Sequence, residues 1–424
     1  MKRLECLDGL RGLLAVYVLL GHMAPFAVLP GWLQRAVSHG GAAVDLFFVL
    51  SGLVITQSLQ RADGRMKPFL VARVTRIFPV FLLVFALAVA VQPWSCGFER
   101  MPWVGPDDAA RTICVMAWPH AWMTEILAHL TMTHGLFPNC VLPDVWVSFL
   151  GAAWSLSTEW QFYVLALFVA GMSGAGHSAP LSRPAVPKRA RIRACWEQGL
   201  LPHRPGPAPA MTESDAAACA PVIHHQTLCW ILLGLAAAGF AWRMAAPDAW
   251  QFSRAFLPNK GHFFALGVAS VPIARRETRA LTRYLVVLLL TLAVCATQES
   301  AGKMLPPLAW TFCLAVQMRP DMVGLAMAGR LLRSRPAQYL GAISYCLYLV
   351  NEPIHKLAGT VLSRIADGDA TLFTLFWLPV SIGLPIVASG WLHAYLEVPM
   401  LRRGRLAARR HRLCRHAPGG YRSQ

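Results

Sequence analysis

Residues 7–24 read LDGLRGLLAVYVLLGHMA, a run that is apolar enough to enter a bilayer yet carries Arg11 and His22. An ionised Arg and a titratable His are costly in hydrocarbon, so by default they mark a functional site. Eleven residues at about 100° each bring both side chains to one helix face, about 16 Å apart along the axis. The alternative is an Arg that snorkels to the membrane surface and a His satisfied by a neighbouring helix.

The composition predicts an all-α polytopic membrane protein. Of 424 residues, 56% are hydrophobic and 14% are charged, values far from those of a soluble domain. The formal net charge of +18 could suggest a nucleic-acid partner. However, the basic residues lie mostly in short loops between apolar segments, where they set the orientation of the chain in the membrane. Membrane lipid is therefore an expected partner, and nucleic acid is not.

Ten apolar stretches have the length of a membrane span. They are predicted at about 8–28, 43–60, 73–92, 150–171, 227–245, 257–273, 281–297, 305–327, 338–362 and 372–396. An eleventh stretch, 117–137, is less apolar because it contains Glu125, His129 and His134. We expect it to be re-entrant or to lie on the membrane surface.

The distribution of positive charge predicts the orientation. With ten crossings and the N-terminus inside, the cytoplasmic loops and both termini hold 28 of the 39 Lys and Arg residues. This is the positive-inside pattern, and an eleventh crossing would spoil it. Both termini are therefore predicted to be cytoplasmic, in a multi-pass protein of the cell (plasma or inner) membrane. Lys2 and Arg3 precede a first span that we interpret as a retained signal anchor.

Residues 1–403 are predicted to form one membrane domain. Within it, residues 172–226 are rich in Pro, Ala, Gly and Arg, a composition typical of a flexible cytoplasmic loop. Residues 404–424 are predicted to form a basic cytoplasmic tail. Two of three cysteines in one predicted external loop could form a disulfide bond, with the connectivity open: Cys96, Cys114 and Cys140.

A second charged feature is the pair Arg73 and Arg76, which lies at i and i+3 and therefore on one helix face. The pair is expected at the same membrane side as Arg11. Three guanidinium groups at one membrane mouth suit a polyanion such as a phosphate or pyrophosphate, which Arg binds by bidentate contacts. The alternative is a pair of anchors that touch lipid phosphates.

Two further motifs place acids in or beside apolar segments. The run WSLSTEWQFY (154–163) contains Glu159, which needs an Arg, a His or water as a partner. The run VDLFFVLSG (44–52) contains Asp45, which could cap its helix or orient His22, and capping is favoured. Other polar residues of these motifs are predicted as supporting side chains: Ser51, Ser155 and Tyr163.

Six motifs resemble, in order, those of the acyltransferase family 3 membrane proteins. They are RGLLAVYVLLGH, GAAVDLFFVLSGLVI, RVTRIFPVF, WSLSTEWQFY, ISYCLYL and YLEVPMLRR. The resemblance implies about ten membrane helices and transfer of acyl groups, often acetyl, from cytoplasmic acyl-CoA to hydroxyls of sugars or other acceptors. It also implies that the essential Arg and His of the first helix are Arg11 and His22. Where many members have a His after the late YL motif, this chain has Asn351, and whether His355 substitutes is open.

These observations together lead to a functional hypothesis. The phosphates of acyl-CoA would lie near Arg73 and Arg76, while His22 would act as general base, with Arg11 and Glu159 in the same catalytic set. The acceptor would be a hydroxyl of a sugar, polysaccharide, glycolipid or related molecule. No metal site is predicted. A transporter or flippase of a glycan or lipid-linked substrate is the alternative, because buried charges would also line such a path.

Overall fold

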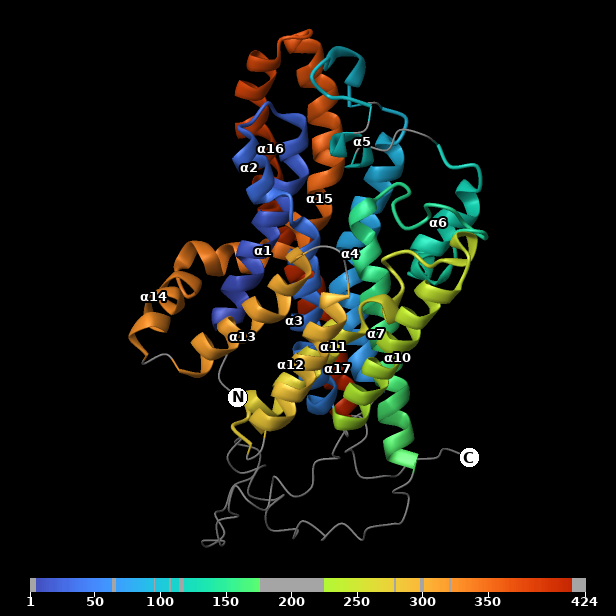
Figure 1. The fold of residues 1–424 in the computed structure, drawn as a ribbon, viewed down its shortest axis with the longest axis vertical. Coiled ribbons are helices and arrows are strands. Elements are labelled where there is room, and N and C mark those ends of the chain that lie inside the picture. Colours follow the sequence, from blue (N-terminus) through green and yellow to red (C-terminus); the bar gives the residue numbers. More distant parts are fainter. Residues whose placement is uncertain are drawn as a thin grey trace, which may run out of the picture.

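The computed structural model describes residues 5–62, 66–94, 96–106, 108–113, 118–175, 225–277, 280–297, 301–319 and 322–413. In this part of the chain the regular structure is helical, and Pro138 with Phe252 forms only an isolated bridge. The all-α prediction is therefore confirmed for these residues. The α-helices (Figure 1) are α1 Glu5–Met23, α2 Gly31–Val37, α3 Gly40–Arg61, α4 Met66–Val91, α5 Ala109–Ile113, α6 Trp122–Leu130, α7 Trp154–Ala175, α10 His225–Ala245, α11 Gly261–Ala274, α12 Ala280–Ala296, α13 Leu305–Met318, α14 Val323–Leu332, α15 Arg335–Ala366, α16 Ala370–Leu392 and α17 Val398–Leu413.

Among the described segments, five are long and apolar enough to cross a membrane. They are Glu5–Phe26, Gly31–Arg61, Met66–Val91, His225–Ala245 and Ala370–Gly404. The apolar helices α11 and α12 have 14 and 17 residues, or about 21 and 26 Å at 1.5 Å per residue. The count of ten crossings therefore stays a prediction.

Two of the predicted stretches have a different form. The stretch 305–327 was expected to be one span, but α13 ends at Met318 and α14 begins at Val323. The sequence explains the break, because Pro320 disfavours a helical conformation of the residue before it. The stretch 117–137 contains the nine-residue helix α6, which at about 14 Å is too short to cross as a helix.

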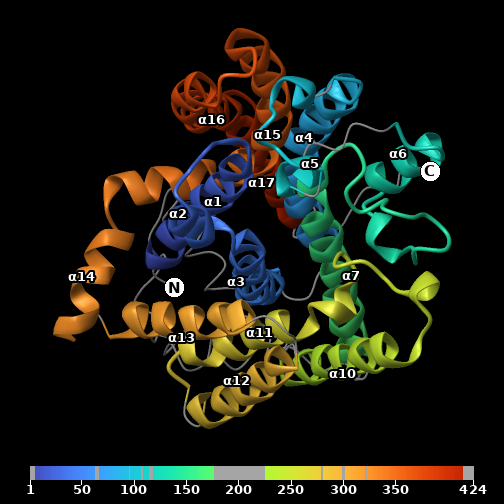
Figure 2. The same cartoon turned by 45° about the horizontal axis from the view of Figure 1, so that its top comes forward.

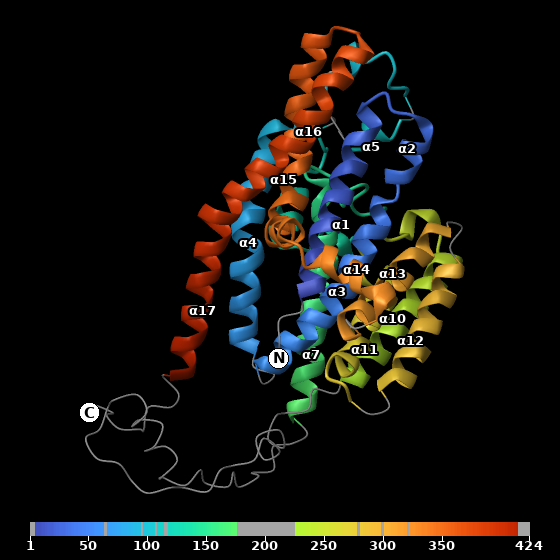
Figure 3. The ribbon, with the colours of Figure 1, turned by 90° about the vertical axis from the view of Figure 1, so that its left-hand side faces the viewer.

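The helices form two groups on either side of α1, α3 and α7. In Figure 2, α10, α11, α12 and α13 lie on one side of these three helices, and α4, α15 and α16 lie on the other. Figure 3 gives the same arrangement from another direction and places α17 beside α4, which it contacts. The central helices are therefore covered on both sides.

Helices α1 and α15 approach each other closely because glycines face one another. A methyl group at Gly12 would lie 2.5 Å from the backbone nitrogen of Gly341, and one at Gly341 would overlap the carbonyl oxygen of Asp8. Small residues at such crossings allow the dispersion contacts that hold membrane helices together. Gly12 directly follows Arg11, so this crossing also fixes where that guanidinium group enters the bundle.

Helices α3 and α11 have a second crossing of this kind. A methyl group at Gly52 would overlap the carbonyl oxygen of Phe264, and one at Gly267 would overlap that of Val49. Gly52 directly follows Ser51, another predicted site residue. Both crossings therefore lie beside predicted site residues.

The predicted domain boundaries are only partly within the described residues. Of the predicted loop 172–226, residues 176–224 lie outside them, as do residues 414–424 of the predicted tail. Helix α17 runs from Val398 to Leu413, across the boundary predicted at 403. The domain division therefore stays a prediction.

We predict that Gly341→Leu destabilises the protein by about 1–3 kcal/mol or more, because the added side chain must separate α1 from α15. Thermal unfolding of the detergent-purified protein measures this. Gly383→Leu is the matched control, since a methyl group at Gly383 of α16 would meet nothing within 4 Å. Equal melting temperatures for the two variants would contradict the close crossing.

Candidate functional site

A cavity of about 110 Å³ lies among α1, α3, α4, α7 and α15. It has room for several water molecules or a group of the size of a phosphate. Its wall contains most of the side chains that the sequence predicted for the site, although they come from four helices far apart in the chain. These are Arg11, Ser51, Arg73, Arg76, Ser155, Glu159 and Tyr163.

Glu159 is held by hydroxyl groups and not by an arginine. Ser155, Glu159 and Tyr163 follow one another at four-residue intervals, so one face of α7 lines the cavity. The hydroxyls of Ser51 and Tyr163 both donate to Oε1 of Glu159, at 2.8 and 2.6 Å. Oε2 of Glu159 has no hydrogen-bond partner among the described residues. The carboxylate therefore joins α3 to α7 and keeps one oxygen available.

None of the three arginines has a carboxylate oxygen closer than 4.0 Å among the described residues. Arg11 donates from Nη2 to Ser344 Oγ at 3.1 Å, and its distance to Asp8 Oδ1 is 4.0 Å. Arg73 donates to Ser58 Oγ at 2.6 Å, and its guanidinium group lies 5.6 and 6.0 Å from the ring centres of Phe69 and Tyr163.

Arg76 has no hydrogen-bond or ion-pair partner within the described part of the chain, and Nε of Arg73 is buried there without one. None of the three guanidinium groups forms an ion pair with Glu159 within 4.0 Å among these residues. Three cations therefore face one carboxylate around a cavity of largely apolar wall. Such an excess of positive charge favours an anionic ligand.

His22 lies on the same helix as Arg11 but does not line the cavity. Its Nδ1 is 2.7 Å from Oδ1 of Asn351. Since Arg11 contacts Ser344, both side chains of α1 face α15, and the prediction that they share a face is confirmed.

The cavity reaches toward His22 at an aromatic pair. Phe47 and Tyr348 both line the cavity, and their ring centres are 6.2 Å apart. Phe47 packs against the small cluster of Ala15, Leu19 and Leu347, in which Leu19 is one turn before His22 in α1. Tyr348 is one turn before Asn351 in α15. The pair therefore lies about one helical turn from the His22–Asn351 bond.

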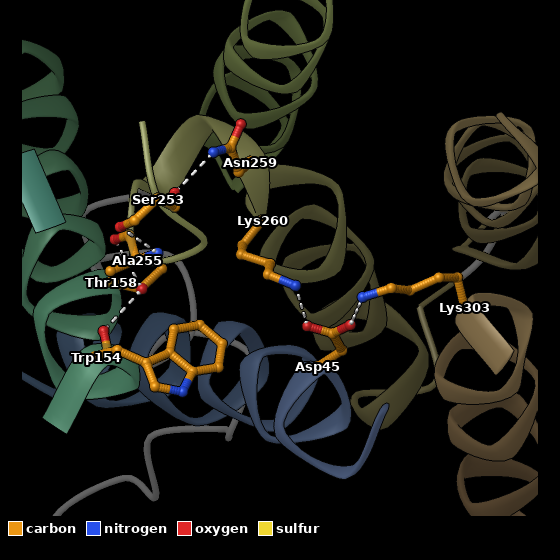
Figure 4. A network of polar contacts seen from close by, with 8 residues as sticks. All are labelled: Asp45, Trp154, Thr158, Ser253, Ala255, Asn259, Lys260 and Lys303. Carbon is orange, nitrogen blue, oxygen red and sulfur yellow. Dashed lines mark hydrogen bonds and ion pairs between the residues drawn. The ribbon is translucent and has the colours of Figure 1, made fainter. Parts of the chain in front are cut away.

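The predicted role of Asp45 as a helix cap is wrong. Helix α3 begins at Gly40, with His39 as its N-cap and no side-chain cap bond, so Asp45 lies more than one turn inside it. Asp45 is fully buried and instead pairs with Lys260 Nζ at 2.6 Å and Lys303 Nζ at 3.4 Å (Figure 4). Nor does it orient His22, whose partner is Asn351.

The half-buried acid Glu352 forms a link between α15 and the segment before α7 that the sequence did not indicate. Its two carboxylate oxygens accept hydrogen bonds from the backbone nitrogens of Gly151 and Ala152, each at 2.9 Å. Gly151–Ala153 is the 3-10 turn that precedes α7. Glu352 therefore sets the start of α7, the helix that carries Glu159. The sequence signal that could have identified Glu352 is the presence of an acid within an apolar span.

A second unassigned acid, Glu397, lies in a π-helical turn, His393–Glu397, between α16 and α17. Glu397 is buried; its Oε2 is 2.7 Å from Nδ1 of His393 and accepts a weak bond from the thiol of Cys346 at 3.4 Å. Such turns bulge one residue out of register and re-aim the side chains around them. The sequence has no local signal for this turn beyond the acid itself.

Comparison with known proteins identifies the family. A family model described as an acyltransferase domain matches residues 4–394, which include every helix around the cavity. The chain belongs to the acyltransferase 3 family.

The names of three relatives found by sequence comparison agree with this membership. A Bacillus subtilis (strain 168) protein, YrhL, named as a candidate peptidoglycan O-acetyltransferase, is 25% identical over 84% of this chain and 49% of its own length. An O-acetyl transferase of Shigella phage Sf6 is 26% identical over 39% of this chain and 45% of its own length. A Komagataeibacter xylinus protein, BcsY, named as a candidate membrane-bound transacylase, is 30% identical over 40% of this chain and 38% of its own length. The chain thus spans less than half the length of each, and no solved structure matches it.

Three histidines outside the first helix, His129, His134 and His355, have structural partners. His355 is buried in α15, its Nε2 lies 2.8 Å from the carbonyl oxygen of Ser381, and its ring packs on Trp377. His129 and His134 stack with ring centres 4.1 Å apart, and burial lowers the pKa of His129 to about 4. Within the described residues, no three His, Cys, Asp or Glu side chains form a group that could hold a metal ion.

The structure tests part of the predicted cysteine pairing. Cys96, which follows α4, is disulfide-bonded, whereas Cys140 is a free thiol. Cys114 lies outside the described residues. A disulfide that includes Cys140, which the sequence left open, is therefore absent from this structure.

We predict that Lys260→Met destabilises the protein by about 3–5 kcal/mol, because Asp45 would stay buried with only the longer contact to Lys303. The double variant Asp45→Leu/Lys260→Met removes both charges and should recover much of this loss. Thermal unfolding in detergent measures both. A double variant that is no more stable than Lys260→Met alone would contradict a buried ion pair.

Proposed function

We propose that this protein is an integral membrane O-acyltransferase. It would move an acyl group, most simply acetyl, from acyl-CoA to a hydroxyl of a sugar, polysaccharide, glycolipid or related acceptor. The observation that carries the proposal is the cavity in which Arg11, Arg73 and Arg76 face the single carboxylate of Glu159, in a chain of an acyltransferase family.

Arg73 and Arg76 would bind the phosphate groups of the acyl donor. Both lie on the cavity face of α4, and Arg11 adds a third guanidinium group from α1. Guanidinium groups bind phosphate oxygens through paired N–H donors, and these three have donors that no carboxylate occupies. The cavity holds only a small group, so the nucleoside end of the donor would stay outside it. Glu159 would balance one of the three positive charges and keep Ser51 and Tyr163 oriented.

His22 would act as the general base. As the acceptor oxygen bonds to the acyl carbon, Nε2 of His22 would take the hydroxyl proton, and it would return this proton to the thiolate released when the carbon–sulfur bond breaks. An arginine or a backbone N–H would stabilise the oxyanion. The Phe47–Tyr348 pair lines the cavity, and Tyr348 is one turn before Asn351, the partner of His22, so the acyl end would pass these two rings. Direct transfer is the simplest route, and a transient acyl-enzyme needs a nucleophile that this site does not assign.

The proposal includes an orientation in the membrane. We propose ten crossings with both termini in the cytoplasm, supported by the positive-inside count. The disulfide of Cys96 supports the same orientation, because disulfides persist in oxidising compartments. Cys96 follows the C-terminal end of α4, whereas Arg73 and Arg76 lie in its N-terminal half. The arginines would then face the cytoplasmic pool of acyl-CoA, and His22 would lie toward the acceptor side of a plasma or inner membrane.

We predict that His22→Gln lowers kcat by about 10²- to 10⁴-fold, the range that loss of a general base produces. Gln keeps a donor for Asn351 but cannot take a proton, so the fold should be retained. The measurement is acyl transfer by purified protein in lipid, with His39→Gln, at an exposed histidine, as the matched control. Full activity of His22→Gln would exclude His22 as the base.

We predict that Arg73→Ala and Arg76→Ala each raise the KM for acyl-CoA by about tenfold to a hundredfold, since a hydrogen bond to a charged group contributes about 1.5–3 kcal/mol. The KM for the acceptor should change much less. Arg330→Ala, at an exposed arginine of α14, is the control.

The same assay separates the enzyme from a transporter. Acceptor-dependent release of CoA is expected only from an acyltransferase, whereas movement of a glycan or lipid-linked substrate without CoA release would support the transporter. Unchanged KM values for acyl-CoA in both arginine variants would remove them from the donor site.

A further inference from the structure

Asn351 is a fully buried amide whose hydrogen-bonding capacity is used by three partners. Its Nδ2 donates to the carbonyl oxygens of Leu347 at 3.0 Å and Tyr348 at 2.7 Å. Its Oδ1 lies 2.7 Å from Nδ1 of His22. An Asn amide has two N–H donors, so both are committed to the preceding turn of α15.

This arrangement determines which way the amide faces. If its oxygen and nitrogen were exchanged, the oxygen would face two carbonyl oxygens, and three acceptors would meet without a proton among them. The nitrogen must therefore face Leu347 and Tyr348, and the oxygen must face His22. Because that oxygen can only accept, Nδ1 of His22 must carry a hydrogen in both the neutral and the charged ring.

We propose that Asn351 is a positioning residue that fixes the neutral His22 ring as the Nδ1–H tautomer and leaves the lone pair on Nε2. This inference rests on the proposed function, in which His22 is the base. Nε2 is then the nitrogen that exchanges the proton, and it lies across the ring from the bond between Nδ1 and Asn351. A His oriented by a neighbouring acceptor is the usual way in which one ring nitrogen is selected for chemistry.

The neighbours of Asn351 keep this acceptor in place. Glu352, the next residue, binds the backbone nitrogens of Gly151 and Ala152 and so ties this turn of α15 to the start of α7. Pro353 has no N–H and cannot donate a hydrogen bond to the carbonyl of Leu349. A helix kinks at such a missing bond. The amide of Asn351 bonds to carbonyls of the turn just before this point. The ring of His22 is therefore oriented by a segment fixed from two sides.

The first test determines the tautomer of His22 by ¹⁵N NMR and does not depend on activity. In protein labelled with ¹⁵N in its histidines, the difference between the spectra of wild type and His22→Gln isolates the His22 signals. We expect a protonated Nδ1 and an unprotonated Nε2 in neutral His22. In Asn351→Leu, which has no acceptor, the ring should revert to the Nε2–H form that a free imidazole prefers. Nε2–H in the wild type would overturn the proposal.

The second test reads turnover. Asn351→Leu should lower kcat on the order of 10- to 100-fold, as loss of a partner that orients a functional imidazole does, with little change in KM for acyl-CoA. Asn351→Asp keeps an acceptor for His22 but loses the bonds to the two carbonyls, so it should retain Nδ1–H and lose less activity. Gln57→Leu, at a buried amide whose Nε2 has no partner among the described residues, is the control with unchanged activity.

The two tests separate this inference from the proposed function. If Asn351→Leu keeps both Nδ1–H and full kcat while His22→Gln is inactive, the positioning role is wrong and the base stands. If His22→Gln is active while the spectra show Nδ1–H, the tautomer is as inferred and the base is wrong. If Asn351→Leu does not fold, the wild-type spectrum alone decides the tautomer.

Discussion

The site depends on close approach between helix backbones. At Gly12 with Gly341, and at Gly52 with Gly267, no side chain separates the helices, so α1 contacts α15 and α3 contacts α11 directly. In a bilayer the lipid tails are as apolar as leucine, so this packing has to provide much of the attraction between helices. Arg11 directly precedes Gly12, and Ser51 directly precedes Gly52. The two crossings therefore hold both side chains at the cavity. A displacement of either crossing would move a charged or polar group of the site.

The second constraint is electrostatic. Three guanidinium groups and one carboxylate meet in a helical bundle where an unpaired charge is costly. The structure reduces this cost with neutral partners: Ser344 and Ser58 accept from Arg11 and Arg73, and the rings of Phe69 and Tyr163 flank Arg73. Because no carboxylate oxygen of the described residues comes closer than the 4.0 Å between Asp8 and Arg11, these cations keep their capacity to bind an anion. The pair Asp45–Lys260 is different, since each charge there already has its partner.

Local sequence signals predicted the fold class and most of the cavity. A charged residue in an apolar stretch can be recognised from the sequence by itself, and this is how Arg11, Arg73, Arg76 and Glu159 are predicted. The residues that contact such a side chain cannot be recognised, because they are far away in the chain. Asp45 and Lys260 are separated by 215 residues, and the sequence does not indicate that they meet.

The same limit applies to His22 and to one predicted span. Asn351 was noticed as an unusual residue, but its bond to His22 spans 329 positions. The break between α13 and α14 was missed because apolar composition continues past Pro320, although the helix does not.

The proposed role of the arginine cavity is to take the phosphate end of an acyl donor. A cryo-electron microscopy structure of the protein in lipid nanodiscs with bound CoA would show this binding directly. We expect phosphate density within hydrogen-bond distance of Arg73 and Arg76, about 2.7–2.9 Å from their guanidinium nitrogens. CoA bound elsewhere, with Arg73 still donating to Ser58 and no density in the cavity, would contradict it.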